Sequence, residues 1–226
     1  MKIIAISHIQ MNLDPIKLIR DEVTSADLVL LSGNLTLNGS WGEIHKLIEM
    51  LKILNPNILA VMGNQDSKEV LEYLSLKDLS LHGRGKVINN IGFYGLGGSN
   101  QTLFQRPLEY TEKSINGLLS KGIDGVGNSD YTILVASQGP QGTKLDTSLG
   151  GYHVGSRTLR SFIFKYPPRV LVSAPIFESA SSDRLGPTVL ASPEPFKLGG
   201  YVVIDTSLDH PVEIKNAYQN SMKYSG

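Results

Sequence analysis

The sequence predicts an α/β fold in which a mainly parallel sheet packs against a second, mixed sheet, in one domain spanning residues 1–226. Two observations lead to this prediction. In the first third of the chain, short apolar segments alternate with amphipathic ones, which is the pattern of βαβ units. In the rest, strand candidates outnumber helices, and no linker, repeat or low-complexity tract divides the chain. The 41% apolar content is enough to build a buried core at this length.

Three strand–helix pairs are expected in the first third of the chain. Each strand is a short apolar run without helical periodicity, and each helix opens on a recognisable start signal. The strongest is the capping box formed by Ser40 and Glu43, ahead of apolar residues at helical spacing. The predicted strands are Lys2–Ser7, Asp27–Leu31 and Ile58–Met62, and the helices open at Asp14-Pro15, Ser40 and Ser67.

The second part of the chain is richer in strands. Six short β-branched or aromatic runs predict strands, and two amphipathic stretches predict helices. The strands are Val87–Ile88, Ile91–Tyr94, Thr132–Ala136, Val170–Val172, Thr188–Ala191 and Tyr201–Ile204, and the helices lie near Glu109–Leu119 and Gly155–Phe164. Between them, Gln138–Tyr152 is a Gly-rich loop, and loops of this length in compact domains are often functional.

Composition and charge exclude several classes of protein. The 21 Lys and Arg residues balance the 21 Asp and Glu residues, so the broad basic surface of a dedicated nucleic-acid-binding protein is absent. The chain has no Cys, which excludes disulfides, thiolate metal sites and iron–sulfur clusters. The first residues are too short an apolar run for a signal peptide, and no run is long enough to span a membrane. We therefore expect a cytoplasmic protein without a membrane or nucleic-acid partner.

Neutral polar residues follow four of the predicted strands at the point where each strand ends. Ligands of open α/β sheets bind outside the carboxyl ends of the strands, so these side chains are expected to share one crevice. The residues are His8 and Gln10, Asn34, Asn64 and Gln65, and Ser137 and Gln138.

Several motifs then occur in order along essentially the whole chain. IAISHIQ stands where a strand followed by S-D-x-H is expected, LSGNLT where G-D-L-T is, and VMGNQD where G-N-[HC]-D is. GFYGLGGSNQTLF, ILVASQGPQGTKLD, VGSRTLRSFI, APIFES and the final TVLASPEPF follow in register. Together they resemble the calcineurin-like metallophosphoesterases, in particular the small prokaryotic and archaeal members. The resemblance implies a four-layer αββα sandwich of two mixed sheets flanked by helices.

Members of that family hydrolyse phosphoesters with two divalent metals such as Mn, Fe or Zn, and the resemblance assigns their ligand positions to this chain. The first Asp corresponds to His8 and the following His to Gln10. The bridging Asp corresponds to Asn34, and the Asn ligand is retained as Asn64.

The remaining metal-ligand positions that the resemblance assigns also carry residues other than the family's ligands. The His at the end of a later strand corresponds to Ser137, or to Gln138 if the register shifts by one. The last two His ligands correspond to Pro175 and Phe177, and the proton-donating His corresponds to Gln65. No carboxylate remains at any ligand position. Two divalent cations about 3.5 Å apart repel by about 19 kcal/mol at an effective dielectric constant of about 20, so we expect no metal cofactor and no catalytic residue.

Other residues have ordinary structural interpretations. The Gly97–Asn100 turn either cradles a phosphate or is a tight loop, and loop geometry is preferred. Asp66 and Asp146 are expected to cap loops or helices. The remaining histidines are expected mostly at the surface, although His153 is close enough in sequence to the long loop to reach the crevice. These histidines are His45, His82, His153 and His210.

The losses are confined to metal-ligand positions, whereas turn and packing motifs are intact. The first hypothesis is therefore an inactive phosphoesterase fold kept as a binding, scaffold or regulatory module, with a protein partner or self-association. The superfamily is known for such members, among them a retromer subunit and small subunits of DNA polymerases. The second hypothesis is a small-molecule or nucleotide-binding protein that uses the crevice. The third is a residual metal-dependent phosphoesterase, with His8 or His153 as the only candidate bases.

Overall fold

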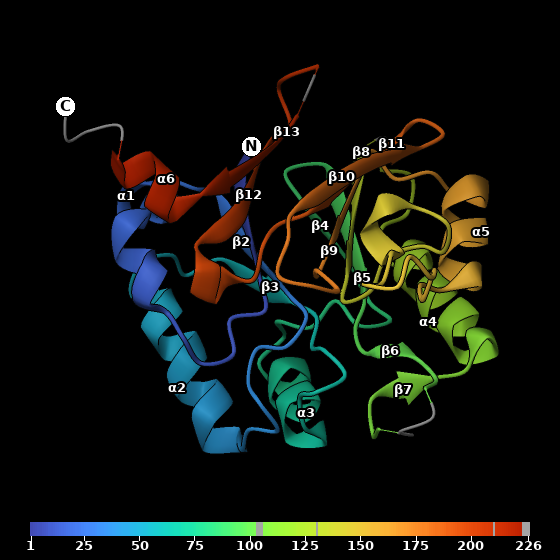
Figure 1. Ribbon diagram of the computed structural model, residues 1–226, viewed down its shortest axis with the longest axis horizontal. Helices are drawn as coiled ribbons and strands as arrows, with labels where there is room; N and C mark the ends of the chain where they lie inside the picture. The colour runs from blue at the N-terminus through green and yellow to red at the C-terminus, as the bar shows by residue number, and fades with distance from the viewer. Residues whose placement is uncertain (103–105, 130, 210, 223–226) are drawn as a thin grey trace.

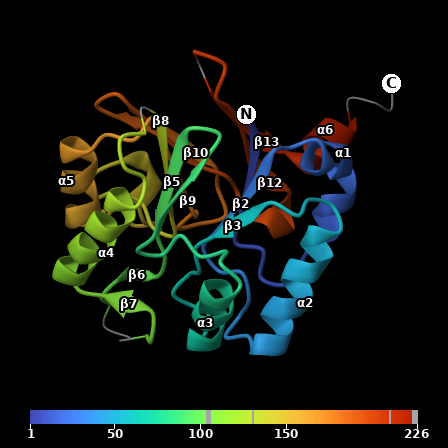
Figure 2. The same cartoon turned by 180° about the vertical axis from the view of Figure 1, so that it is seen from behind.

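The computed structural model describes residues 1–102, 106–129, 131–209 and 211–222. Two β-sheets pack face to face, with helices on both outer faces (Figures 1 and 2). Helices α1 (Arg20–Thr24) and α2 (Trp41–Lys52) lie on one side, and α4 (Glu112–Asp124) and α5 (Arg157–Lys165) lie on the other. This is the four-layer αββα arrangement that the motifs imply, so the predicted fold class is confirmed.

The first sheet has the strand order β13-β12-β1-β2-β3. Its three N-terminal strands run parallel to one another, β12 pairs with β1 in antiparallel fashion, and β13 pairs antiparallel with β12. The strands are β1 (Lys2–Ser7), β2 (Leu28–Ser32), β3 (Ile58–Ala60), β12 (Gly200–Asp205) and β13 (Val212–Asn216).

The second sheet has the order β10-β11-β9-β8-β5-β4, with a parallel centre and an antiparallel strand at each edge. Its strands are β4 (Gly85–Ile88), β5 (Ile91–Leu96), β8 (Tyr131–Ala136), β9 (Val170–Ser173), β10 (Ser181–Leu185) and β11 (Thr188–Ser192). The remaining elements are α3 (Lys68–Leu76), α6 (Ala217–Met222), the short pair β6 (Ser99–Asn100) and β7 (Glu109–Tyr110), and the 3-10 turns η1 (Asp14–Leu18), η2 (Lys144–Asp146) and η3 (Phe196–Leu198).

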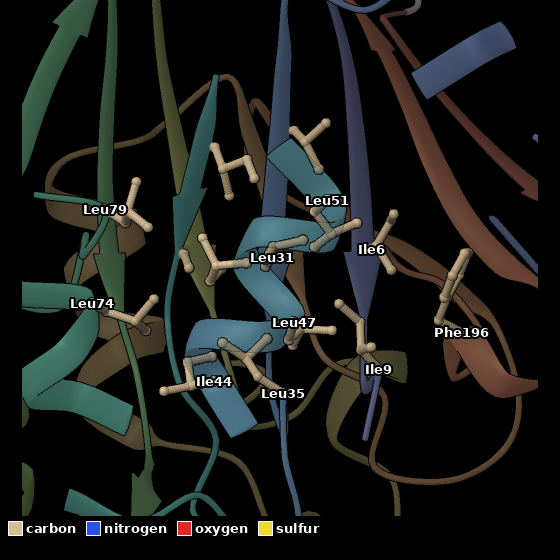
Figure 3. Packing of buried hydrophobic residues seen from close by; sticks show 14 of the residues in the cluster. Ile6, Ile9, Leu31, Leu35, Ile44, Leu47, Leu51, Leu74, Leu79 and Phe196 are labelled. Atoms are coloured by element: carbon tan, nitrogen blue, oxygen red, sulfur yellow. The ribbon is translucent and has the colours of Figure 1, made fainter. Parts of the chain in front are cut away.

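Apolar side chains fill three layers between these elements. The middle layer joins the two sheets, with residues such as Ala5 and Leu30 from the first and Phe93 and Val135 from the second. The outer layers pack α1, α2 and α3 on the first sheet, and α4 and α5 on the second. In Figure 3, Leu47 of α2 and its apolar neighbours lie against the strands of the first sheet. The position of every crevice residue depends on this packing, because the crevice is built where the strands end.

The strongest helix signal is confirmed. The Ser40 side chain accepts the Glu43 backbone N–H, and the Glu43 carboxylate accepts the Ser40 N–H, which completes the capping box of α2. The helix expected from Asp14 is divided instead. It forms η1 and then α1, with the Ile19 backbone between them outside the helical region.

Several elements differ from the sequence-based prediction. The strands β10 and β13 were not predicted, because edge strands with one solvent-facing side carry polar residues and lack a continuous apolar run. The helix expected from Glu109 begins at Glu112, since Thr111 caps it and Glu109–Tyr110 pairs with β6. The C-terminal α6 was also missed. In the portion of the chain that the structure describes, no helix has the length and apolar character needed to cross a membrane.

Candidate functional site

A crevice of about 270 Å³ opens where β1, β2, β3, β8 and β9 end. This is the lower edge of the sheets in Figure 1, beside α3 and the β6–β7 pair. The walls come from segments that are distant in sequence but adjacent at the carboxyl ends of the strands. The lining residues are His8, Asn34, Asn64, Gln65, Ser99, Asn100, Thr102, Ser137, Gln138, Gly139, Val154, Gly155, Pro175 and Ile176.

Seven of the nine residues predicted for the crevice line it in the structure. The other two, Gln10 and Phe177, are partly buried but are not among the lining residues. Gln10 has a left-handed backbone (φ 49°) and donates its backbone N–H to the Asn34 carbonyl. Gln10 therefore contributes to the path of the loop after β1 rather than to the wall of the crevice.

The His8 ring is fixed by two backbone groups. The Asn34 backbone N–H donates to His8 Nδ1 at 3.0 Å, so Nδ1 is an acceptor. The other ring nitrogen must then carry the proton, and Nε2–H donates to the Pro175 carbonyl at 2.8 Å. A Cβ on Gly33 would lie 2.7 Å from Nδ1, which is why only glycine fits beside the ring.

This arrangement leaves His8 with no free lone pair for a metal ion or for a proton. Burial lowers the pKa of His8 below its ordinary value, the hydrogen bond to the Pro175 carbonyl opposes this, and the charge of Lys197 lowers it further. The ring is therefore neutral at pH 7. His8 acts as a bridge between the loop after β2 and the segment after β9.

Asn34, which the sequence resemblance assigns to a bridging-carboxylate position, joins two loops. Its Oδ1 accepts the backbone N–H of Gln65 at 3.0 Å, and its side chain is almost completely buried. A Cβ on Gly63 would lie only 2.0 Å from this oxygen, so the glycine is required for the two loops to approach. The amide thus joins the loops after β2 and β3.

Three further amide side chains line the crevice, and they differ in how many hydrogen bonds they make to the protein. The side chains of Asn64 and Gln65 make no hydrogen bond to any residue that the structure describes. Gln138 is 7% exposed, and its Oε1 accepts the Asn100 backbone N–H at 2.9 Å. Its Nε2 is buried and has no partner among the described residues. The crevice therefore retains unused amide groups.

The two aspartates expected to cap loops do so. Asp66 accepts the backbone N–H groups of Leu35, Thr36 and Gly63 as well as the Thr36 hydroxyl, at 2.7–3.0 Å. Burial raises the pKa of Asp66, and these hydrogen bonds oppose that shift. Asp146 is fully buried and accepts from three backbone N–H groups around the long loop and from His153 Nδ1.

The turn after β5 uses its backbone N–H groups inside the protein. Gly97 donates to His82 Nδ1, Gly98 to the Met62 carbonyl, and Ser99 to the Leu108 carbonyl. The Asn100 N–H goes to Gln138, as described above. No N–H of this turn is left to cradle a phosphate, which supports the loop-geometry interpretation.

The other histidines that the structure describes are not among the residues that line the crevice. His45 is exposed, and His153 is held by the buried Asp146 at 2.8 Å rather than reaching the crevice. His82 differs from the expected surface placement, because it packs beneath the turn after β5 and beside Tyr110. Burial lowers the pKa of His82 to about 4. His210 lies outside the described residues.

The donor set does not fit a two-metal centre. Across residues 1–102, 106–129, 131–209 and 211–222, no group of three or more His, Asp or Glu side chains is arranged to hold a metal ion. At the crevice itself, both His8 nitrogens and Asn34 Oδ1 are taken by the backbone. Amides alone cannot offset the repulsion between two divalent cations.

Some lining residues were not singled out from the sequence. Ser99, Asn100 and Thr102 enter from the turn after β5, and Val154 and Gly155 enter from the segment between the long loop and α5. The Gly-Gly-Ser-Asn motif and the length of the loop were the available signals. Neither signal indicates which side chains turn inward, because that depends on contacts such as Asn100 Nδ2 with the Val154 carbonyl.

A sandwich of two mixed sheets with a polar crevice at its strand ends is the architecture of the metallophosphoesterases. The chain belongs to the calcineurin-like phosphoesterase family, whose family model matches residues 1–174. An uncharacterized protein of Methanocaldococcus jannaschii is 36% identical over 211 residues, which cover 91% of this chain and 92% of that protein.

Two solved structures illustrate how widely the fold is shared. A protein of Thermus thermophilus has a TM-score of 0.76 at 18% identity, covering 96% of this chain and 98% of that one. A dimetal phosphatase from Danio rerio has a TM-score of 0.56 at 7% identity, covering 96% of each chain. At these identities the likeness concerns the fold alone.

Proposed function

We propose that this protein is a non-catalytic member of its family and acts as a binding module. The observation that carries the proposal is the state of His8, whose two ring nitrogens are both engaged by backbone groups. The residue at the first ligand position is thus part of the framework. It offers neither a metal ligand nor a general base.

The rest of the crevice supports the same conclusion. Asn34 replaces a carboxylate and is tied to the Gln65 backbone, while Pro175 contributes a carbonyl that His8 already uses. His153, the other candidate base, is bound to Asp146 away from the crevice. Among the described residues of the crevice wall, no group is therefore placed to activate a water molecule.

A protein partner or a second copy of the chain is part of this proposal. Three large apolar side chains are exposed within six positions of the loop beside the crevice. These are Leu149 at 88%, Tyr152 at 75% and Val154 at 45% exposure. Light scattering on the wild type and on Leu149→Ser tests self-association, and a mass that is monomeric for both would leave a different protein as the partner.

The proposal is tested by assaying hydrolysis of bis(p-nitrophenyl) phosphate with Mn²⁺, Fe²⁺ or Zn²⁺, with an active dimetal phosphatase as the positive control. We expect no turnover above background. Asn64→Ala removes the one retained ligand residue and serves as the matched variant. Metal-dependent turnover that chelator abolishes and that Asn64→Ala reduces would contradict the proposal.

A further inference from the structure

Two buried amides in the crevice are oriented by backbone donors. Asn34 Oδ1 accepts the Gln65 N–H, and Gln138 Oε1 accepts the Asn100 N–H. A backbone N–H can only donate, so the oxygen of each amide must face it. Each NH₂ group is then directed away from that contact. The Gln138 NH₂ is buried without a partner among the described residues. The Asn34 NH₂ also makes no hydrogen bond to a described residue.

The buried, unpaired Gln138 NH₂ group requires an explanation. Asn34 is 4% exposed and Gln138 is 7% exposed, and both line the crevice. Buried polar atoms in folded proteins nearly always have a hydrogen-bond partner, because an unpaired donor is unfavourable. An occupant that supplies acceptor atoms at these two amides would satisfy them.

The charge of the wall restricts what that occupant can be. No Lys, Arg, Asp or Glu is among the described residues that line the crevice, and His8 is neutral. Lys197, whose charge acts on His8, is paired with Glu178 at 2.7 Å. A phosphate or carboxylate would therefore be buried there without an unpaired cation among the described lining residues, which is unfavourable. The remaining groups are the unused amides of Asn64 and Gln65 and the apolar surfaces of Val154 and Ile176.

We propose that the crevice binds an uncharged, nucleobase-type heterocycle. Its carbonyl or ring-nitrogen acceptors would pair with the NH₂ groups of Asn34 and Gln138. The Asn64 amide, which offers both a donor and an acceptor, would read another edge of the ring, as Asn and Gln do with bases in nucleic acids. The volume of about 270 Å³ is near the lower end for ligand pockets and matches a small ring system.

This inference rests on the proposed function, because two metal ions and their waters would occupy the same space and engage Asn64. The test therefore uses chelator-treated protein. Adenosine, guanosine, cytidine and uridine are each added at up to about 1 mM, and binding is followed by thermal unfolding and by calorimetry. Inorganic phosphate and the four nucleoside 5′-monophosphates are measured in parallel.

At least one nucleoside is expected to raise the unfolding midpoint and to bind, whereas inorganic phosphate is expected to do neither. The corresponding monophosphate should bind no more than about tenfold more tightly, since none of the described lining residues carries a positive charge. The inference is overturned if none of the nucleosides binds, or if the monophosphate gains more than about tenfold.

Variants locate the binding. Asn64→Ala is expected to weaken the nucleoside by about tenfold, and Asn116→Ala, which removes an exposed amide on α4, should leave the affinity unchanged. Gln138→Glu keeps the acceptor for the Asn100 N–H and removes the NH₂ donor, so it should abolish binding. If that buried substitution prevents folding, Asn64→Ala alone decides, and unchanged affinity overturns the inference.

The two proposals fail separately. Metal-dependent phosphodiester hydrolysis would contradict the proposed function whatever the nucleosides do. Absence of nucleoside binding in a protein that neither binds metal nor hydrolyses phosphodiesters would remove only the ligand assigned to the crevice.

Discussion

The loop that follows β3 contains two kinds of polar residue within three positions. Asp66 is buried and accepts four hydrogen bonds that close this loop against the loop after β2. Asn64 and Gln65 line the crevice, and their side chains have no partner among the residues described. Asp146 resembles Asp66 in this respect, because its carboxylate accepts hydrogen bonds from three backbone N–H groups. Carboxylates therefore lie where backbone donors surround them, whereas none is among the described residues that line the crevice.

This contrast has a simple physical basis. A buried carboxylate is stable only when hydrogen bonds or a cation compensate for its lost hydration. Backbone N–H groups provide that compensation at Asp66 without any bound ion. Carboxylates gathered at metal-ligand positions would repel one another if no metal were bound, whereas amides do not. The crevice of this protein is therefore compatible with a stable fold in the absence of metal.

The largest effect on stability is expected for Asp66, whose hydrogen bonds hold the loops after β2 and β3 together. Asp66→Ala leaves the N–H groups of Leu35, Thr36 and Gly63 without their acceptor, so the free energy of unfolding should fall by about 4 kcal/mol. Urea unfolding followed by circular dichroism measures the change. Asp124→Ala, at an exposed helix end, is the control and should change the stability by less than about 0.5 kcal/mol. Equal effects of the two substitutions would show that the closing hydrogen bonds contribute little.

The second effect concerns pH. Burial lowers the pKa of His82 from 6.5 to about 4, so the unfolded chain binds this proton more tightly than the folded one. Its contribution to stability is present above pH 6.5 and is lost as the pH falls towards about 4, amounting to about 3 kcal/mol. His82→Asn removes the titration and keeps an acceptor for the Gly97 N–H.

The stability of the wild type and of His82→Asn is compared across this pH range by urea unfolding. His8 also has a lowered pKa and acts in the same direction in both proteins, so the difference between the two curves isolates His82. The curves should diverge below pH 6.5. Parallel curves would mean that His82 titrates normally in the folded protein.

A smaller loss is expected where two loops approach. In Gly63→Ala, the added Cβ would lie 2.0 Å from Asn34 Oδ1, so the amide must move and the stability should fall by about 3 kcal/mol or slightly less. Gly117→Ala is the matched control, because its Cβ meets no atom within 4 Å on α4. That control should gain up to about 1 kcal/mol from helix propensity. Thermal and urea unfolding distinguish the two signs, and a stabilised Gly63→Ala would contradict the close approach.

The smallest effect is expected on the crevice wall. Asn64→Ala and Gln65→Ala remove side chains without hydrogen bonds to the described residues, so the free energy of unfolding should change by less than about 0.5 kcal/mol. The measurement is the same urea titration that is used for Asp66→Ala. Asn64 and Gln65 precede Asp66 by only two positions and one, so the comparison stays within one loop. A loss as large as that of Asp66→Ala would show that these amides belong to the framework.

Much of the fold could be predicted because its signals are local. The capping box at Ser40 and the β-branched run at Lys2–Ser7 each determine an element from neighbouring residues alone. Strands β10 and β13 could not be found in this way, because their polar, solvent-facing residues form strands only when a neighbouring strand pairs with them.

The candidate site was likewise predictable only where its signals are local in sequence. The gathering of polar residues at strand ends was predictable from the order of strands and loops. The role of His8 was not, since its ring is defined by Asn34 and by a carbonyl 167 residues away, on Pro175. For the same reason, the presence of Asn100 and Val154 in the crevice wall and the absence of Gln10 from the described lining residues depend on tertiary contacts that no local pattern records.

The central claim is that the crevice has lost its metal centre. It is tested most directly by calorimetric titration of the chelator-treated protein with Mn²⁺ and Zn²⁺. Because both ring nitrogens of His8 and the Asn34 Oδ1 are hydrogen-bonded to backbone groups, we expect no binding tighter than about 1 mM for either ion. Two-site binding at about 1 µM would contradict the claim and would mean that residues other than those at the family's ligand positions have rebuilt the centre.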